Sequence, residues 1–255
     1  MKNLFNLKGK NCLITGSSRG LGFAMAKGMG EAGANLIING RNKKNLEKSV
    51  GMLQQEGIDN VHGYTFDIID KKEIVQKIAL IEKEVGPIDI LVNNAGINKR
   101  GPLEEISEEL WCEVIDINLK GAFLVSQQVV KGMIKRRAGK IINTCSLMSE
   151  LGRNTIAPYA ASKGGLKMLT KNMAVEWAQY NIQVNGIGPG YFITDMTEPL
   201  RADHDFDQWL KNRTPARRWG YPEELVGALI FLSTPASDFV NGQIIYVDGG
   251  ILATI

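Results

Sequence analysis

The chain is poor in the residues that build metal sites and disulfide frameworks. It has two histidines and three cysteines among 255 residues. His62 and His204 lie far apart in the sequence, and no two cysteines have CxxC spacing. Zinc sites in proteins need clustered His or Cys ligands, so we predict no metal site. Widely spaced cysteines, odd in number, are typical of reduced packing residues in a reducing compartment.

The chain also lacks long apolar runs and a strong excess of charge. A transmembrane helix needs about 20 consecutive apolar residues, and no stretch approaches that length. Residues 1–11 are polar and lack the apolar centre of a signal peptide. The net charge of +3 is too small to indicate binding to nucleic acid or to a membrane surface. We therefore expect a soluble, cytoplasmic protein whose partner is a small molecule.

Short apolar runs alternate with helical stretches along the whole chain. Seven runs are predicted to be buried parallel strands: 11–15, 35–38, 61–66, 88–92, 140–144, 182–187 and 243–247. Helices are predicted at 20–32, 42–56, 71–84, 107–137 (with a bend), from 158 onwards, and at 223–233. This alternation predicts one α/β domain over 1–255, a doubly wound parallel sheet (Rossmann fold) with helices on both faces. Residues 189–215 are expected to be irregular.

A glycine-rich stretch, TGSSRGLG at 15–22, follows the first predicted strand and opens a helix. Glycines allow a tight turn and close approach to a pyrophosphate, and a helix N-terminus offers free amides and a positive dipole end. The stretch therefore predicts a dinucleotide site. The candidate cofactor-binding residues here are Gly16, Ser18, Arg19, Gly20, Leu21 and Gly22. The alternative is a glycine-rich turn that binds no ligand.

The second predicted strand ends without the acidic residue that usually accepts from the ribose of NAD. The junction is Asn39-Gly40-Arg41. Two guanidiniums, of Arg41 and of Arg19, suit a 2′-phosphate, which favours NADP(H), with NAD(H) as the alternative. Asp67, after the third strand, is a candidate partner for the adenine amino group or, alternatively, a helix cap.

Tyr159 and Lys163 are four residues apart in a stretch that begins with Pro158, a residue suited to the first turn of a helix. In a helix they project from one face. An ammonium beside a phenol stabilises the phenolate, so we expect the pKa of Tyr159 to be lowered towards working pH. Such a phenol can exchange a proton with a substrate oxygen. The alternative is an ordinary surface pair.

Further polar and glycine residues lie directly after other strands, where ligands bind in such sheets. Asn94 and Gly96 follow the fourth strand, and Ser146 follows the fifth. Asn118 lies inside a long predicted helix, where Asn is a poor former and needs a reason such as a kink or a bound water. Turn chemistry explains each residue alone, but it does not explain their joint placement.

Together these motifs resemble the short-chain dehydrogenase/reductase family along nearly the whole chain. The matching pieces are Thr15-Gly16-xxx-Gly20-x-Gly22, Asn93-Asn94-Ala95-Gly96, Asn118, Ser146, Tyr159-xxx-Lys163 and Pro189-Gly190. The resemblance implies that Tyr159 is the catalytic acid/base and that Lys163 holds the nicotinamide ribose and lowers the Tyr159 pKa. It implies that Ser146 orients the substrate and that Asn118 supports the water of a proton relay. Implied cofactor contacts further along are Pro189, Gly190, Phe192 and Thr194.

Four segments resemble the gluconate 5-dehydrogenases, also called 5-ketogluconate reductases: 146–153, 185–191, 214–220 and 247–250. This likeness implies the pair D-gluconate and 5-keto-D-gluconate, so the partner would be a sugar acid or keto acid. A carboxylate requires a cation, and Arg100 and Arg153 are placed for it, with surface solvation as the alternative. Other interpretations are a 3-oxoacyl-thioester reductase, another sugar or polyol reductase, or a non-catalytic cofactor-binding regulator. Intact Ser146, Tyr159 and Lys163 disfavour the last.

Two expectations concern mobility and assembly. Residues 195–215 are polar with interleaved aromatic residues, which predicts a substrate lid that closes over bound ligands. The apolar C-terminus, residues 250–255, is expected to pack against other parts of the assembly. The family resemblance implies a homotetramer built through the long helices and the last strand.

Overall fold

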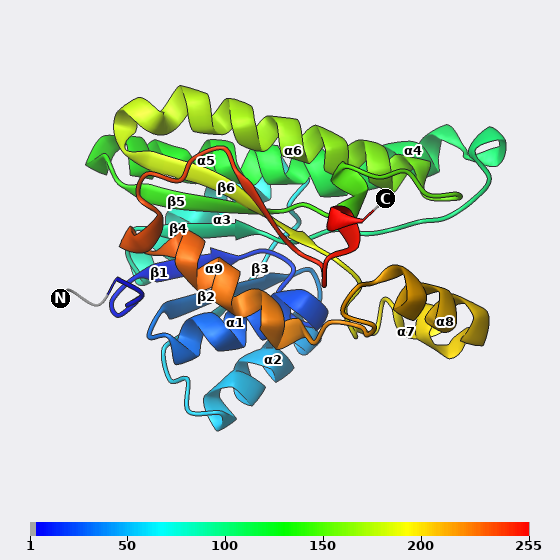
Figure 1. The fold of residues 1–255 in the computed structure, drawn as a ribbon. Helices are drawn as coiled ribbons and strands as arrows, with labels where there is room; N and C mark the ends of the chain where they lie inside the picture. Colours follow the sequence, from blue (N-terminus) through cyan, green and yellow to red (C-terminus); the bar gives the residue numbers. More distant parts are fainter. Residues whose placement is uncertain (1–3, 255) are drawn as a thin grey trace.

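The structure is a computed structural model that describes residues 4–254. Within them, a parallel sheet of seven strands has the order β3-β2-β1-β4-β5-β6-β7 (Figure 1). The strands are β1 (Asn11–Ile14), β2 (Asn35–Gly40), β3 (Val61–Thr65), β4 (Ile90–Asn93), β5 (Gly139–Thr144), β6 (Ile182–Pro189) and β7 (Ile244–Val247). The predicted Rossmann fold is confirmed, and each predicted strand is present with shifts of a few residues at its ends.

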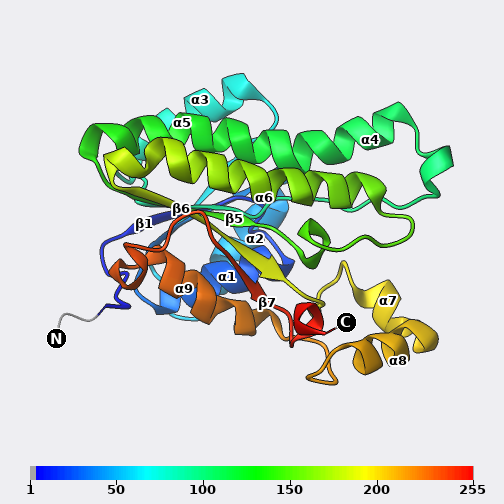
Figure 2. The same ribbon diagram turned by 45° about the horizontal axis from the view of Figure 1, so that its top comes forward.

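Helices cover both faces of the sheet (Figures 1 and 2). One face carries α1 (Gly20–Glu31), α2 (Lys43–Gln55) and α9 (Val226–Ser233), and the other carries α3 (Lys71–Glu84), α4 (Glu108–Ile115), α5 (Gly121–Arg136) and α6 (Ala157–Trp177). Successive residues of β1 face opposite cores: Ile14 packs with Met25 and Leu229, whereas Leu13 packs with Ile78 and Val125. Strands buried on both faces need apolar residues at every position, which is why they appear as continuous runs.

The strand order reverses direction between β1 and β4, so a crevice opens beyond their carboxyl ends. Thr15 holds this point together: its Oγ1 accepts from the backbone N–H of Asn94 (3.0 Å) and of Ala95 (3.1 Å). The Asn94 side chain donates in return to the carbonyls of Thr15 (3.1 Å) and Gly16 (3.0 Å). The glycine loop and the loop after β4 are therefore fixed to each other.

The long helix predicted over 107–137 is present as two α-helices in succession, α4 and α5. A π-helical turn, Asp116–Lys120, joins α4 to α5 and contains Asn118. Such turns insert an extra residue and are frequent at functional sites. Asn118 thus lies at a break in the regular α-helical pattern, where its side chain bonds to Ile97 and Ser162.

The prediction that residues 189–215 are irregular is wrong. Two helices, α7 (Glu198–Ala202) and α8 (His204–Arg213), lie side by side at the carboxyl end of β6 (Figure 2). Asp203 caps α8 by accepting from the N–H groups of Asp205 and Phe206, both at 3.1 Å. Leu210 is fully buried and Phe206 packs against the same cluster, so two apolar side chains anchor an otherwise polar helix whose periodicity is weak in the sequence. Within residues 4–254, each helix is too short or too polar to cross a membrane.

Candidate active site

The glycine loop between β1 and α1 has the geometry of a phosphate cradle. Gly16 and Gly20 have φ angles of +62° and +57°, which favour glycine. A Cβ on Gly16 would lie 2.7 Å from Cα of Ala95, whereas one on Gly20 would meet nothing within 4 Å. Arg19, the N-cap of α1, makes no side-chain cap. The first amides of α1 thus remain available to an anion at the crevice.

The residues expected at the adenosine end lie at one edge of this loop. Gly40 lies against Ser18, since a Cβ on Gly40 would be 3.2 Å from Oγ of Ser18. Arg41 and Arg19, which follow these two residues in the chain, therefore belong to adjacent loops at this edge. Arg41 is 65% exposed, and its guanidinium lies 4.0 Å from Asp67. Asn39 cannot replace the missing acid, because it is buried and donates to the carbonyls of residues 64 and 66.

Tyr159 and Lys163 lie one turn apart on α6, as the spacing predicts. Lys163 is only 4% exposed, and its Nζ donates to the carbonyl of Thr144 at 2.6 Å. The Nζ is 5.7 Å from the centre of the Tyr159 ring. Burial lowers the pKa of Lys163 to about 8. The buried ammonium lies close to Gly96, where an added Cβ would be 3.7 Å from Nζ.

The expected lowering of the Tyr159 pKa is not what the structure shows. Burial raises the pKa of Tyr159, and a hydrogen bond with Ser146 opposes this rise in part. Lys163 does not offset the burial, because its ammonium points to the carbonyl of Thr144. Tyr159 is consequently a protonated phenol near neutral pH, which is the form that can donate a proton to a ketone.

Ser146 and Asn118 approach the Tyr159 helix from two other elements, Ser146 by a hydrogen bond with Tyr159 and Asn118 by one with Ser162. Ser146 directly follows β5, is 7% exposed, and its Oγ accepts from the N–H of Met148 (3.1 Å). The Asn118 side chain donates to the carbonyl of Ile97 (2.9 Å) and to Oγ of Ser162 (3.0 Å), and accepts from the N–H of Ile97 (2.8 Å). Asn118 therefore ties the loop after β4 to the helix of Tyr159.

The segment after β6 places the remaining predicted cofactor residues. Gly190, directly after Pro189, approaches the β7 end so closely that a Cβ would lie 2.7 Å from Cα of Asp248. The side chain of Phe192 is 4% exposed and packs in the core, so only its backbone is available to a ligand. Thr194 Oγ1 lies 3.2 Å from Oγ1 of Thr197.

The two arginines proposed for a carboxylate lie together. The N–H of Gly101 donates to the carbonyl of Thr155, joining the loops that carry Arg100 and Arg153. Partial burial and the positive charge of Arg153 lower the pKa of Arg100. Among residues 4–254, neither guanidinium forms an ion pair with a carboxylate. Two cations that repel each other without an acidic partner favour an anionic ligand.

Tyr191 lies directly after β6 and contacts the arginine pair. Its hydroxyl accepts from Arg153 at 3.0 Å. Ser146, which forms a hydrogen bond with Tyr159, lies directly after the neighbouring strand β5. The candidate proton donor and the candidate carboxylate ligands are therefore carried by segments at the same carboxyl edge of the sheet.

A scan against protein-family models matches residues 10–205 to the model described as short chain dehydrogenase. The chain belongs to the short-chain dehydrogenase family. It is 58% identical over 255 residues to 2-dehydro-3-deoxy-D-gluconate 5-dehydrogenase of Formosa agariphila, covering 99% of this chain and 96% of that one. It is 55% identical to 5-keto-D-gluconate 5-reductase of Escherichia coli K12, with both chains covered in full. A crystal structure of a gluconate 5-dehydrogenase from Burkholderia cenocepacia, in complex with NADP and tartrate, superimposes with a TM-score of 0.96 at 48% identity, covering 99% of each chain.

In this short-chain dehydrogenase, the sequence reasoning missed a group of aromatic residues near the arginine pair. Phe206 from α8 and Trp219 pack around Tyr191, with ring centres 5.8 and 5.9 Å from it. The sequence signal for Phe206 was the interleaving of aromatic residues in 195–215, whereas Tyr191 and Trp219 lie outside that range. A metal cluster was not predicted, and residues 4–254 contain no group of three or more potential His, Cys, Asp or Glu ligands.

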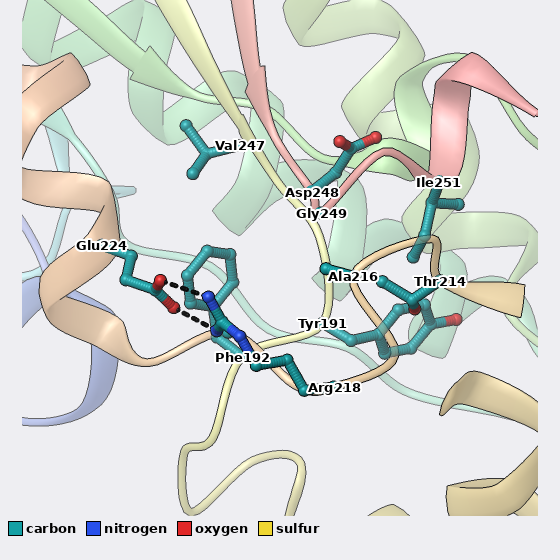
Figure 3. A pocket seen from close by; sticks show the side chains of 11 residues that line it. Tyr191, Phe192, Thr214, Ala216, Arg218, Glu224, Val247, Asp248, Gly249 and Ile251 are labelled. Atoms are coloured by element: carbon teal, nitrogen blue, oxygen red, sulfur yellow. Dashed lines mark hydrogen bonds and ion pairs between the residues drawn. The ribbon is translucent and has the colours of Figure 1, made fainter. Parts of the chain in front are cut away.

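A small cavity of about 110 Å³ lies beside this aromatic group (Figure 3). Arg218 and Glu224 form a two-bonded ion pair at its wall, with both N–O distances at 2.7 Å. The cavity is lined by Tyr191, Phe192, Thr214, Ala216, Arg218, Gly220, Glu224, Val247, Asp248, Gly249 and Ile251. The loop after α8, the end of β7 and the segment that follows β6 all line this cavity, so the three segments lie next to one another.

Proposed function

We propose that the chain interconverts a secondary alcohol and a ketone at C5 of a six-carbon sugar acid, with NADP(H) as the cofactor. The leading pair is D-gluconate and 5-keto-D-gluconate. The observation that carries the proposal is that Arg100 and Arg153 lie together without a carboxylate partner, with Arg153 bonded to Tyr191 after β6. Ser146, the partner of Tyr159, follows the neighbouring strand β5 at the same edge of the sheet. The names of the relatives support the same substrate class.

The residues of the crevice fit a dinucleotide. The positive φ of Gly16 and Gly20 and the uncapped start of α1 suit the pyrophosphate. Arg19 and Arg41 suit a 2′-phosphate, since each guanidinium can give charged hydrogen bonds to it. Asp67 lies beside Arg41 and limits its freedom. Candidate contacts for the rest of the cofactor are Asn94, Gly96, Tyr159, Lys163, Pro189, Gly190, Thr194 and the backbone of Phe192.

NADPH supplies the hydride for ketone reduction, and NADP accepts it in the reverse direction. The chain moves the proton. In reduction, the phenol of Tyr159 donates its proton to the carbonyl oxygen, while Ser146 holds that oxygen by a hydrogen bond. In oxidation, the Tyr159 phenolate removes the proton of the alcohol. Lys163, whose Nζ lies close to Gly96 in the crevice, is placed to hold the nicotinamide ribose. Asn118 ties the helix of Tyr159 to the loop after β4.

Arg100 and Arg153 are the proposed partners of the substrate carboxylate. A charge-assisted hydrogen bond is about twice as strong as a neutral one, so an anionic substrate gains most from such a pair. This arrangement disfavours a 3-oxoacyl thioester, which would need a long apolar channel instead. It also disfavours a non-catalytic regulator, which needs neither a proton donor nor a substrate cation.

A second candidate pair has 2-dehydro-3-deoxy-D-gluconate as its alcohol. The 58% identity to the Formosa agariphila enzyme of that name favours it. The two alcohols differ only at C2 and C3. Oxidation at C5 and binding of the carboxylate by the arginine pair would therefore be the same for both substrates.

The deciding experiment is a panel of sugar acids, keto acids and neutral polyols with NADP(H) and NAD(H), followed at the nicotinamide absorbance. We expect turnover of 5-keto-D-gluconate with NADPH and a higher kcat/KM than for any neutral ketose. The ratio of kcat/KM for D-gluconate and 2-dehydro-3-deoxy-D-gluconate decides between the two candidates. Failure to turn over any sugar acid or keto acid would disprove the proposed substrate class.

We also propose a cytoplasmic homotetramer. Cys12 and Cys145 are free and buried, as suits a reducing compartment. Apolar side chains on α5 and α6 are exposed, with Val175 at 81% and Phe123 at 40%, and β7 forms an edge of the sheet. Such surfaces favour association. A mass of about 112 kDa, four times the chain mass of 28.0 kDa, is expected from light scattering; a monomer would contradict the assembly.

We propose in addition that residues 195–215 act as a lid. In α7 no residue is buried, whereas α8 is anchored by Leu210. Movement should therefore be confined mainly to α7 and its flanks. Cofactor and substrate together are expected to slow proteolysis within 195–203, and equal cleavage with and without ligands would argue against a lid.

A further inference from the structure

The guanidinium of Arg153 is held by side chains from elements distant in the sequence. Arg153 lies on an exposed loop, next to the exposed Gly152 and Asn154. Its Nη1 donates to the hydroxyl of Tyr191 (3.0 Å), and its Cζ lies 4.5 Å from the centre of the Phe206 ring. The loop alone leaves a long side chain free to rotate, so these two contacts fix its direction.

The aromatic group around Arg153 is itself braced. The Phe206 and Tyr191 rings are 5.8 Å apart, and Trp219 meets Tyr191 edge-on at 5.9 Å. Trp219 Nε1 donates to Asp207 at 2.7 Å, and Lys211 Nζ lies 2.6 Å from the other oxygen of that carboxylate. Of the two acids that flank Phe206, Asp207 is thus neutralised by other partners, and Asp205 is fully exposed. Arg153 keeps its full positive charge for a ligand.

We infer that Tyr191 and Phe206 are positioning residues that aim Arg153 at the carboxylate of the substrate. The inference rests on the proposed function, because it requires that Arg153 binds that carboxylate. A cation held over a ring face and by one hydrogen bond loses less freedom when it binds an anion. Because Phe206 belongs to α8, this helix would contribute to the preference for charged over neutral substrates.

Phe206→Leu tests this with the least disturbance, since Phe206 touches neither Tyr159 nor Lys163 in any described contact. The matched control is Trp209→Leu, because Trp209 stacks on the same ring at 5.2 Å but makes no described contact with Arg153. The substrates are 5-keto-D-gluconate and L-sorbose, in which a hydroxymethyl group replaces the carboxylate.

We expect Phe206→Leu to raise KM for 5-keto-D-gluconate about five- to tenfold, the size of one cation–π contact, with kcat nearly unchanged. KM for L-sorbose should change less than twofold, and Trp209→Leu should leave both values near those of the unchanged protein. Tyr191→Phe, which removes only the hydroxyl, should raise KM for the charged substrate in the same way. It provides a second test if the Phe206 variant does not fold.

A double variant separates this inference from the proposed function. If Phe206 acts through Arg153, then Arg153→Ala with Phe206→Leu should have the same KM as Arg153→Ala alone. Additive effects, or equal effects of Phe206→Leu on charged and neutral substrates, would overturn the positioning role. If Arg153→Ala itself raises KM for both substrates equally, the carboxylate assignment of the proposed function fails instead.

Discussion

The residues proposed to move the proton and those proposed to bind the carboxylate are built in opposite ways. Asn118, Ser146 and Lys163 are at most 7% exposed and are tied by hydrogen bonds to the ends of strands or to helices. Arg100 is exposed on a loop, and Arg153 contacts aromatic rings from α8 and from the segment after β6. The proton-transfer candidates are thus part of the buried sheet and helices, whereas the two arginines lie on loops at the surface.

This contrast separates chemistry from selection. Proton transfer needs groups held to fractions of an ångström, which buried residues on regular elements provide. Selection among substrates is adjusted by loops, which tolerate changes that the core does not. A relative with another substrate can therefore keep the first group and replace the second.

The largest effect is expected in the buried group. Tyr159→Phe removes the proton donor, so turnover should fall about 10²- to 10⁴-fold, the range of general acid–base catalysis. NADP(H) binding, measured by quenching of protein fluorescence, should remain nearly unchanged. Residual activity above about a tenth would correspond to a loss below ~1.4 kcal/mol, too little for a proton donor.

The pH dependence of the reaction rate tests the protonation state of the same residue, Tyr159. Because burial raises the pKa of Tyr159, the phenolate needed for alcohol oxidation is scarce at neutral pH. Oxidation should therefore speed up about tenfold per pH unit from pH 6 to 8, whereas ketone reduction, which needs the phenol, should stay flat. Initial rates in both directions test this. An oxidation rate that is already level below pH 7 would mean a lowered pKa, as the sequence alone suggested.

The exposed group should control KM rather than kcat. Arg100→Ala and Arg153→Ala each remove a charged hydrogen bond of about 1.5–3 kcal/mol, so KM for D-gluconate should rise about tenfold or more. KM for sorbitol, the matching neutral polyol, should change little. Steady-state kinetics with both alcohols provide the comparison, and equal effects would show that neither arginine binds the carboxylate.

A smaller effect is expected at the adenosine end of the crevice. Arg41→Asp removes a partner of the 2′-phosphate and supplies an acceptor for the ribose hydroxyls. The ratio of kcat/KM for NADPH to that for NADH should fall at least about tenfold. Arg41 already contacts Asp67, so Lys43→Asp, at an exposed position nearby, controls for a general change of charge. An unchanged ratio would place Arg41 away from the cofactor.

Much of the fold and of the buried group could be predicted from local patterns. Continuous apolar runs indicated the strands. Because parallel sheets bind ligands beyond the carboxyl ends of their strands, residues near those ends, such as Gly16, Ser146 and Tyr159, could be selected as site candidates. Residues 198–213 were mistaken for irregular chain. These helices are short, α8 begins at the cap Asp203, and few of their side chains, such as Leu210 and Phe206, pack into the core, which leaves no clear periodicity.

The sequence by itself determined the family and the parallel sheet and indicated Tyr159 as the candidate proton donor, since these depend on short motifs and on residue spacing. Only the tertiary structure indicates that burial raises the pKa of Tyr159, and only it gives the surroundings of Arg153. A pKa depends on burial and on where a neighbouring charge points, and the Lys163 ammonium points to the carbonyl of Thr144. The rings of Tyr191 and Phe206 meet Arg153 from positions 38 and 53 residues further along the chain, contacts that no local pattern encodes.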